Sequence, residues 1–228
     1  MKAGCTCDNC ELKGLFYENI NDVMIESICN SKIEQEFKKG DVIINSNDTI
    51  TEFIYLKEGL VKLFKIAENG EEQIFTFAKP FDFVSLLSVF TYNRHNYSVV
   101  AIEPSITCSI QLSELNSLLE SNNKFAISTL KKLSVVSDKI IQESLKIKQK
   151  NVKGRVAYIL LFFSDIIYQS KYFSLPISRK DIANFVGVST ENVIRTMSEF
   201  RKEEIIGIFG KHIEIIDYNK LKKICELG

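Results

Sequence analysis

Residues 175–200 read LPISRKDIANFVGVSTENVIRTMSEF. Ser178, followed three positions later by Asp181, has the form of a helix N-cap, and apolar residues at helical spacing come after it. Gly187 falls where a tight turn needs an unusual backbone angle, which glycine adopts without steric cost. Ser189 can cap a second helix with its own apolar face. Two helices joined across one glycine predict a helix-turn-helix.

The second helix of such a unit enters the DNA major groove with its first turns. Its outward residues are the predicted base readers: Thr190, Glu191, Ile194 and Arg195. Arginine can donate two hydrogen bonds to guanine, and glutamate can accept one from the cytosine amino group. Further polar and basic residues are predicted to contact phosphates: Ser178, Arg179, Lys180, Ser189, Arg201, Lys202 and Lys211. Residues 205–216 predict a β-hairpin in the place of a wing.

The charge distribution supports this prediction. Formal net charge is zero, but residues 1–123 carry 10 Lys and Arg against 18 Asp and Glu, whereas residues 124–228 carry 19 against 11. A basic half is typical of a domain that meets a polyphosphate. We therefore expect double-stranded DNA to bind the second half of the chain.

The first half predicts short β-strands. Alternating apolar residues before and after Lys57-Glu58-Gly59 favour a hairpin there, and Asn69-Gly70 indicates another turn. After a reversal at residues 103–105, a period of two predicts that one face is a core face, with Ile106, Cys108, Ile110 and Leu112 on it. Several antiparallel reversals imply a small β-barrel or β-roll.

Helical periodicity begins near residue 113, with a long helix predicted over 123–150. Its narrow seam favours contact with the same helix of a second copy, and packing of this helix on the β-roll is the alternative. The seam residues are Leu130, Leu133, Ser137, Ile140, Ser144 and Ile147. An apolar core helix is expected over 156–168. No stretch approaches the about 20 apolar residues that span a bilayer, so we expect no membrane contact and a cytoplasmic location.

The chain resembles the CRP/FNR family of bacterial transcription regulators over nearly its whole length. The specific motifs are Lys38-Lys-Gly-Asp-Val-Ile, Glu58-Gly-Leu-Val-Lys-Leu, Lys150-Asn-Val-Lys-Gly-Arg-Val-Ala, Ser178-Arg-Lys-Asp-Ile-Ala and Glu191-Asn-Val-Ile-Arg. The resemblance implies a homodimer that binds a palindromic promoter site and contacts RNA polymerase once an effector is sensed. It also implies that Glu191 and Arg195 read the half-site, while the bulk of Ile194 leaves the half-site sequence open.

The expected fold is α+β: an N-terminal β-roll of the cyclic-nucleotide-binding, jelly-roll type, a long dimerisation helix and a C-terminal winged helix-turn-helix. We assign residues 1–14 to a cysteine-rich segment, 15–122 to the β-roll sensor, 123–150 to the dimerisation helix and 151–228 to the DNA-binding domain. A β-roll that binds a ligand and acts only through protein contacts is the alternative. The two histidines lie near no catalytic motif, so an enzyme is not expected.

The effector is not cAMP according to the resemblance. Family members that bind cAMP use a Gly-Glu pair and an Arg-Ser pair, and the matching positions here hold Ser85-Leu86 and Asn96-Tyr97. The charged clamp for the ribose and the phosphate is therefore missing.

Cysteines offer another sensor. FNR-type members hold a [4Fe-4S] cluster with N-terminal cysteines and one distal cysteine, which implies Cys5, Cys7, Cys10 and Cys108 as ligands here. The Cys-x-Cys-x₂-Cys spacing is tighter than the FNR pattern, and Cys108 also fits a buried packing role. Zinc, a thiol redox switch, or haem in the β-roll therefore stay open as alternatives.

Overall fold

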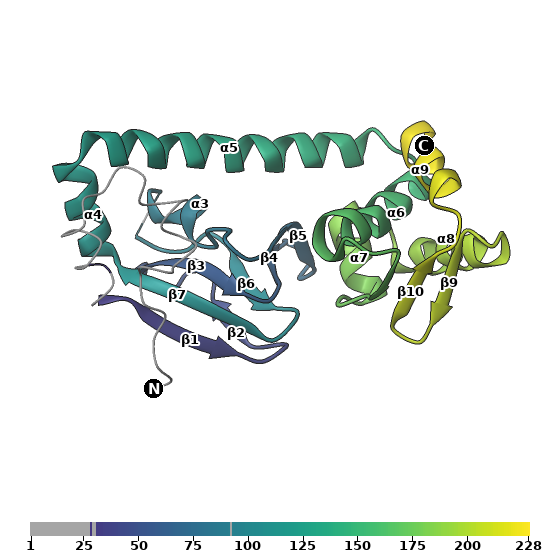
Figure 1. Cartoon of the computed structure of the whole chain (residues 1–228), viewed down its shortest axis with the longest axis horizontal. Helices are drawn as coiled ribbons and strands as arrows, with labels where there is room; N and C mark the ends of the chain where they lie inside the picture. The colour runs from purple at the N-terminus through teal and green to yellow at the C-terminus, as the bar shows by residue number, and fades with distance from the viewer. Residues whose placement is uncertain (1–27, 29–30, 92) are drawn as a thin grey trace. The chain divides into compact units, whose positions relative to one another are not determined.

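The computed structural model describes residue 28 and residues 31–91 and 93–228 (Figure 1). They form two compact units. The first comprises the described residues up to Lys65 together with Phe77–Lys139, and the second comprises Ile66–Thr76 with Ile140–Gly228. Each unit is a mixture of helices and strands, in agreement with the predicted α+β class.

Most of a β-roll made of two sheets lies in the first unit, while its residues 66–76 belong to the second. One sheet has the strand order β1-β7-β3 and the other has the order β2-β6-β4-β5. The strands are β1 (Ile33–Phe37), β2 (Val42–Ile44), β3 (Glu52–Glu58), β4 (Val61–Ile66), β5 (Glu72–Ala78), β6 (Ser98–Ala101) and β7 (Ser105–Gln111). Strand β7 pairs antiparallel with both β1 and β3, which makes it the central strand of its sheet.

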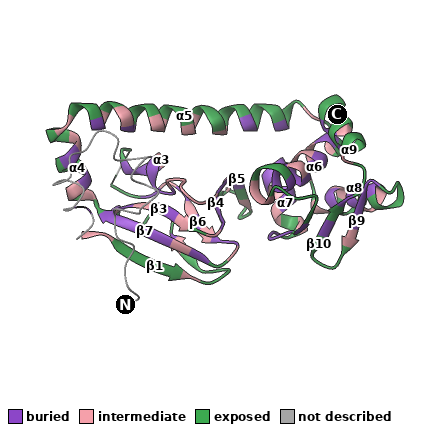
Figure 2. Ribbon diagram, viewed as in Figure 1, coloured by how far each residue is buried: buried purple, intermediate pink, exposed green. Residues whose placement is uncertain are grey.

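Strand β7 is buried on both of its faces (Figure 2). Cys108 and Ile110 belong to the hydrophobic core of the roll, as their alternation predicts. Thr107 and Ser109, on the opposite face, are buried as well, while Ile106 is only partly buried. The predicted core face is thus confirmed at Cys108 and Ile110, and the opposite face of the strand is buried in addition.

The strands on either side of Gly59 do not form the hairpin that the sequence favours. Strand β3 pairs with β7, whereas β4 pairs with β6, so the chain passes from one sheet to the other at this point. Gly59 has φ +92°, and a Cβ added to it would lie 2.4 Å from the carbonyl oxygen of Pro104. Only glycine fits there. The turn at Asn69-Gly70 is confirmed, since β4 and β5 are neighbours in their sheet.

Among the residues that the structure describes, the helices that accompany the roll include α3 (Leu86–Val89), α4 (Leu112–Ser121) and α5 (Asn123–Lys148). The long helix α5 ends within two residues of the predicted limit. Leu115 and Leu118 of α4 and Phe125 of α5 are buried in the same core cluster as β7. The apolar side chains at these positions thus anchor both helices to the roll.

The predicted seam of α5 does not form one uniform exposed row. Leu130 is 61% exposed, but Leu133 packs against the core of the roll and Ile147 is buried. The exposed apolar side chains of α5 that share one side are Ile127, Leu130, Ile141 and Leu145. At about 100° per residue these four lie within an arc of about 60°. We call this row the α5 stripe.

The second unit carries the helix-turn-helix. Its elements are α6 (Val152–Leu161), a π-helical segment η2 (Phe162–Tyr168), β8 (Tyr172–Ser174), α7 (Arg179–Val186), α8 (Thr190–Lys202), β9 (Ile206–Phe209), β10 (His212–Ile215) and α9 (Tyr218–Leu227). The expected helix over 156–168 begins earlier, where Asn151 caps it, and changes to π-helix after Leu161. Strands β8, β10 and β9 form one sheet, of which the sequence predicted only the β9–β10 hairpin. Within the described residues, no helix combines the length and apolarity needed to cross a membrane.

Candidate nucleic-acid interface

Helix α7 begins with the capping box that the sequence predicts. The Ser178 hydroxyl oxygen accepts a hydrogen bond from the Asp181 amide at 3.0 Å, and the Asp181 carboxylate accepts one from the Ser178 amide at 2.9 Å. The helix ends at Gly187, whose φ of 69° and ψ of 48° are left-handed. Ser189 then caps α8 by accepting from the Asn192 amide at 3.2 Å. Local hydrogen bonds therefore define both ends of the turn.

Helix α8 has one buried and one exposed side. Val193, Met197 and Phe200 are at most 1% exposed and form the core side. Glu191, Ile194 and Arg195 are exposed and Thr190 is partly exposed, so the predicted base readers lie on or beside the solvent side. This amphipathic division leaves the first two turns of the helix open to a ligand.

Arg195 is held by a neighbour that the sequence analysis did not single out. Its Nη2 atom donates to the side-chain oxygen of Asn192 at 2.9 Å. The spacing of three residues places the two side chains on adjacent turns, which is the signal that could have identified Asn192. This hydrogen bond thus orients the guanidinium of Arg195 in the protein without DNA.

The predicted phosphate-contacting residues are exposed, with one exception. Ser178, Lys180, Ser189, Arg201, Lys202 and Lys211 are exposed. Arg179 is partly buried, and this burial lowers the pKa of its guanidinium. Ser178 and Ser189 also use their hydroxyl oxygens as helix caps. Both serines lie at helix N-termini, where backbone amides favour an anion.

An ion pair joins α8 to α6. The Lys153 ammonium lies 2.9 Å from the Glu199 carboxylate. This hydrogen bond raises the pKa of Lys153 and lowers that of Glu199, so both groups stay charged. The pair is exposed, and exposed pairs contribute little stability, so we regard it as an orienting contact. Neither residue was predicted to belong to the site.

Arg155 connects several backbone carbonyl groups of the second unit. Its Nη1 atom donates to the carbonyl oxygens of Val186 at 3.1 Å and Gly187 at 3.2 Å. Its Nε atom donates to Lys150 at 2.8 Å, and Nη2 donates to Lys148 at 3.2 Å. One side chain thus connects the end of α5 with the turn of the helix-turn-helix. Arg155 lies in a motif quoted above, but the sequence assigned it no role.

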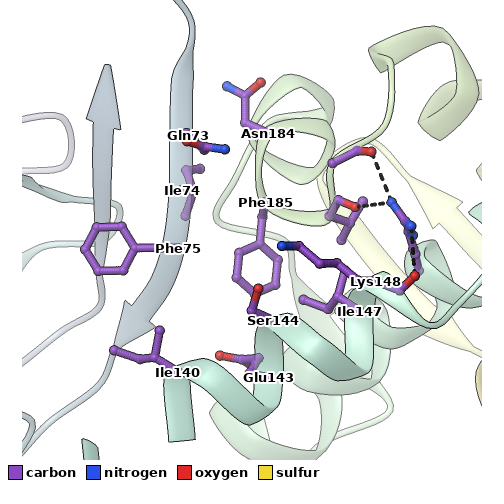
Figure 3. Close-up of a pocket in the computed structure, with 13 residues that line it drawn as sticks. Gln73, Ile74, Phe75, Ile140, Glu143, Ser144, Ile147, Lys148, Asn184 and Phe185 are labelled. Carbon is purple, nitrogen blue, oxygen red and sulfur yellow. Dashed lines mark hydrogen bonds between the residues drawn. The ribbon is translucent and has the colours of Figure 1, made fainter. Parts of the chain in front are cut away.

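Figure 3 shows a cavity of about 360 Å³ in the second unit. Its apolar lining includes Phe75 and Phe185, and Lys148 and Asn184 add polar groups. Three residues of the predicted dimer seam also line it: Ile140, Ser144 and Ile147. Of these three, Ile147 is buried and Ile140 is partly buried, whereas Ser144 is exposed.

In the β-roll, three of the four positions compared with a cyclic-nucleotide clamp are buried: Ser85, Leu86 and Tyr97. Leu86 is 1% exposed. Tyr97 is 3% exposed and donates to the carbonyl oxygen of Val84 at 2.8 Å, and burial raises its pKa to about 12. Asn96 is exposed and donates to Thr91 at 3.3 Å. An apolar side chain and a neutral phenol offer no charge to a cyclic phosphate.

Models of two protein domains match the chain. The model described as a Crp-like helix-turn-helix domain matches residues 154–224, and the model described as a cyclic nucleotide-binding domain matches residues 34–122. Their order and positions agree with the roll and the helix-turn-helix described above. The chain belongs to the CRP/FNR family of transcription regulators.

Several relatives of this CRP/FNR regulator are similar over almost the entire chain. The "Electron transport regulator A" of Shewanella oneidensis is 26% identical, covering 98% of this chain and 92% of the relative. The "Fumarate and nitrate reduction regulatory protein" of Vibrio cholerae is 26% identical, covering 97% and 92%. The structure of FixK2 from Bradyrhizobium japonicum matches with a TM-score of 0.74 at 22% identity, covering 85% of this chain and 96% of that one.

These matches establish the predicted class of protein. The family and the relatives are DNA-binding transcription regulators, which agrees with the prediction of a regulator rather than an enzyme. The match to FixK2 is below 25% identity and shows the fold alone.

The cysteines of this CRP/FNR regulator divide into two groups. Cys5, Cys7 and Cys10 lie outside the described residues, as does Cys29. Cys108 is 2% exposed in the core of the roll, and Cys225 is buried in α9, where burial raises the pKa of its thiol. No group of three potential metal ligands occurs among the residues that the structure describes. The predicted ligand set therefore stays a prediction.

Proposed function

We propose that this CRP/FNR regulator acts in the cytoplasm, where it binds a palindromic promoter site as a homodimer and contacts RNA polymerase. A redox, oxygen or nitric oxide signal, or a small ligand other than cAMP, controls the binding. Helix α8 reads the bases through Thr190, Glu191, Ile194 and Arg195.

The exposed face of α8 is the observation that carries this proposal. The helix is capped at Ser189 and packed through Val193 and Met197, so the exposed Glu191 and Arg195 project from a rigid support. A carboxylate and a guanidinium one helical turn apart match the cytosine amino group and the guanine acceptors in the major groove. Basic residues around the motif supply contacts to the phosphate backbone.

The α5 stripe supports the homodimer. Ile127, Leu130, Ile141 and Leu145 are each 48–61% exposed, yet all are large and apolar. A row of this kind on a 26-residue helix fits a twofold interface in which the same helix of a second copy covers it. Of the seam predicted from the sequence, Leu130 belongs to this row. We therefore propose the α5 stripe as the dimer interface, in place of the seam predicted from the sequence.

The names of the relatives support a redox signal. They include an anaerobic regulatory protein and a fumarate and nitrate reduction regulatory protein. In this chain four thiolates, from Cys5, Cys7, Cys10 and Cys108, would hold a [4Fe-4S] cluster, which supplies a redox-sensitive centre when bound. Zinc, a thiol redox switch or haem are the alternatives.

One observation on the described residues supports Cys108 as a member of such a ligand set. Cys108 and Ile28 belong to the same hydrophobic cluster, so the chain returns from the N-terminal segment close to the core that contains this thiol. The chain between residues 10 and 28 can span up to about 60 Å, which allows the N-terminal cysteines to approach Cys108.

A binding experiment tests the DNA-binding role. Duplexes selected from a randomised palindromic library are titrated with the full chain at several salt concentrations. We expect binding that weakens as salt increases. Arg195→Ala should lose about 1 to 3 kcal/mol of binding free energy, because a guanine contact is removed. Lys139→Ala removes one exposed charge on α5 and serves as the control. Failure to enrich any duplex in any redox state would favour the protein-binding module instead.

A separate measurement tests the sensor. The protein is purified without oxygen, and its absorption spectrum is recorded together with its iron, sulfide and zinc content. Iron and sulfide in the wild-type protein, together with their loss in the Cys108→Ser variant, would support the cluster. A colourless protein without these elements would exclude it and favour a small ligand or thiol chemistry.

A further inference from the structure

Ile194 is an unusual residue on the reading face of α8. Its side chain is 51% exposed, whereas the other large apolar residues of this helix, Val193, Met197 and Phe200, are at most 1% exposed. A single exposed isoleucine needs no explanation by itself. This one lies between Glu191 and Arg195 in the sequence, in the part of a recognition helix that meets base edges.

The hydrogen bond of Arg195 leaves Ile194 uncovered. At about 100° per residue, Ile194 lies about 60° to one side of Glu191, while Arg195 and Asn192 lie on the other side. Because Arg195 donates to Asn192, its guanidinium is drawn away from Ile194. The reading face thus has an apolar flank and a charged flank, separated by Glu191.

The apolar flank is also stiff. A β-branched side chain has essentially one favoured χ1 rotamer in a helix, so Ile194 presents its methyl groups in a defined direction. In the major groove the only apolar group that a base offers is the 5-methyl group of thymine. Every other base would place a hydrogen-bonding group or a bare ring edge against the isoleucine, with loss of hydration and no bond in return.

We propose that Ile194 selects a thymine in each half-site by contact with its 5-methyl group, at a base pair next to those read by Glu191 and Arg195. The inference rests on the proposed DNA-binding function. It predicts a half-site in which one thymine is required for its methyl group and not for its hydrogen bonds.

Deoxyuridine provides a direct test, because it pairs like thymidine and lacks only the methyl group. In the selected palindromic duplex, each thymidine is replaced by deoxyuridine, one symmetric pair of positions at a time. Affinity is measured for the wild type, for Ile194→Ala and for Ile216→Ala. Ile216 is a control matched in residue type and exposure, since it is 54% exposed in the same unit but follows β10.

We expect one thymine position at which the wild type loses about fourfold in affinity for each methyl group removed. Ile216→Ala should show the same loss. Ile194→Ala should bind the thymidine duplex more weakly and show no further loss on substitution by deoxyuridine. This coupling between a side chain and a methyl group is specific to direct contact.

Two results would overturn the inference and can be told apart. If the wild type binds the selected duplex but no thymine position shows a loss that disappears in Ile194→Ala, the thymine contact is refuted and the DNA-binding function stands. If no duplex is enriched, the proposed function fails, and the inference fails with it. Circular dichroism of Ile194→Ala checks that the fold is kept, as expected for an exposed residue.

Discussion

The Nη1 atom of Arg155 donates a hydrogen bond to the carbonyl oxygen of Gly187 at 3.2 Å, across 32 positions of sequence. Gly187 is the left-handed residue that ends α7 and opens the turn to α8. The carbonyl groups at the end of a helix have no partner within the helix. Arg155 therefore completes the C-terminus of α7 and fixes the turn from the side of α6.

Replacing Arg155 should loosen this turn. We expect Arg155→Ala to lower the free energy of unfolding by about 2 to 3 kcal/mol, because several carbonyl groups lose a charged donor. Arg155→Lys should recover only part of the loss, since an ammonium cannot reproduce the forked geometry. Urea denaturation measures both variants, with Lys146→Ala as an exposed control. Equal stability of Arg155→Ala and the wild type would contradict the role of this residue.

Acid should weaken the β-roll through His95. This residue is 5% exposed, and its Nδ1 atom lies 2.8 Å from the Ser88 hydroxyl. Burial lowers the pKa of His95 below 6.5, and the nearby Asp48 opposes this only in part. The unfolded chain thus binds a proton at a higher pH than the folded chain. The stabilising effect of the neutral ring is complete above pH 6.5 and is lost as the pH falls toward the folded-state pKa.

Hydrogen exchange of the segment around α3 between pH 7 and pH 5 measures this effect. After correction for the intrinsic pH dependence of exchange, opening should become easier by at most about 1.4 kcal/mol per pH unit. His95→Asn keeps a polar side chain but does not titrate, so its profile should lack the component due to His95. An unchanged profile in this variant would show that another group is responsible.

The α5 stripe can be tested by adding a charge to it. Ile141→Glu should weaken the free energy of dimerisation by at least about 2 kcal/mol, because a carboxylate would be buried without a partner. Val135 is 67% exposed on the same helix but lies outside the stripe, so Val135→Glu is the matched control. Sedimentation velocity distinguishes the two. Dimers of equal affinity in both variants would mean that the stripe is not the interface.

Gln169 offers a stabilising change. It ends the π-helical segment with φ 50° and ψ 40°, a left-handed conformation that costs energy for any residue with a Cβ. Gln169→Gly should raise the free energy of unfolding by about 0.5 to 1 kcal/mol. Gln169→Ala keeps the Cβ and should give no gain. Thermal unfolding of the two variants checks the prediction, and a gain in the alanine variant alone would refute it.

The helix-turn-helix could be predicted from the sequence because its determinants are local. Ser178 and Asp181 form a reciprocal cap over three residues, Gly187 supplies one backbone angle, and Ser189 caps the next helix. Each of these interactions depends on a few neighbouring positions, so spacing alone identifies it. The burial of Val193 and Met197 follows from the same helical period, and the outward direction of Glu191 and Arg195 follows with it.

Strand pairing and helix faces depended on residues far apart in the chain. Alternation predicted the strands around Gly59, but the partners β7 and β6 are chosen by packing between distant segments, so the expected hairpin does not form. Apolar periodicity likewise cannot tell which side of α5 packs against the rest of its own chain. Leu133 packs against the core of the roll and Ile147 is buried, although both were predicted to face a second copy. The hydrogen bond between Arg155 and Gly187 also joins residues far apart in the sequence, so no local pattern predicts it. Local patterns specify caps, turns and helical periods, whereas burial in a shared core decides which of several apolar faces remains exposed.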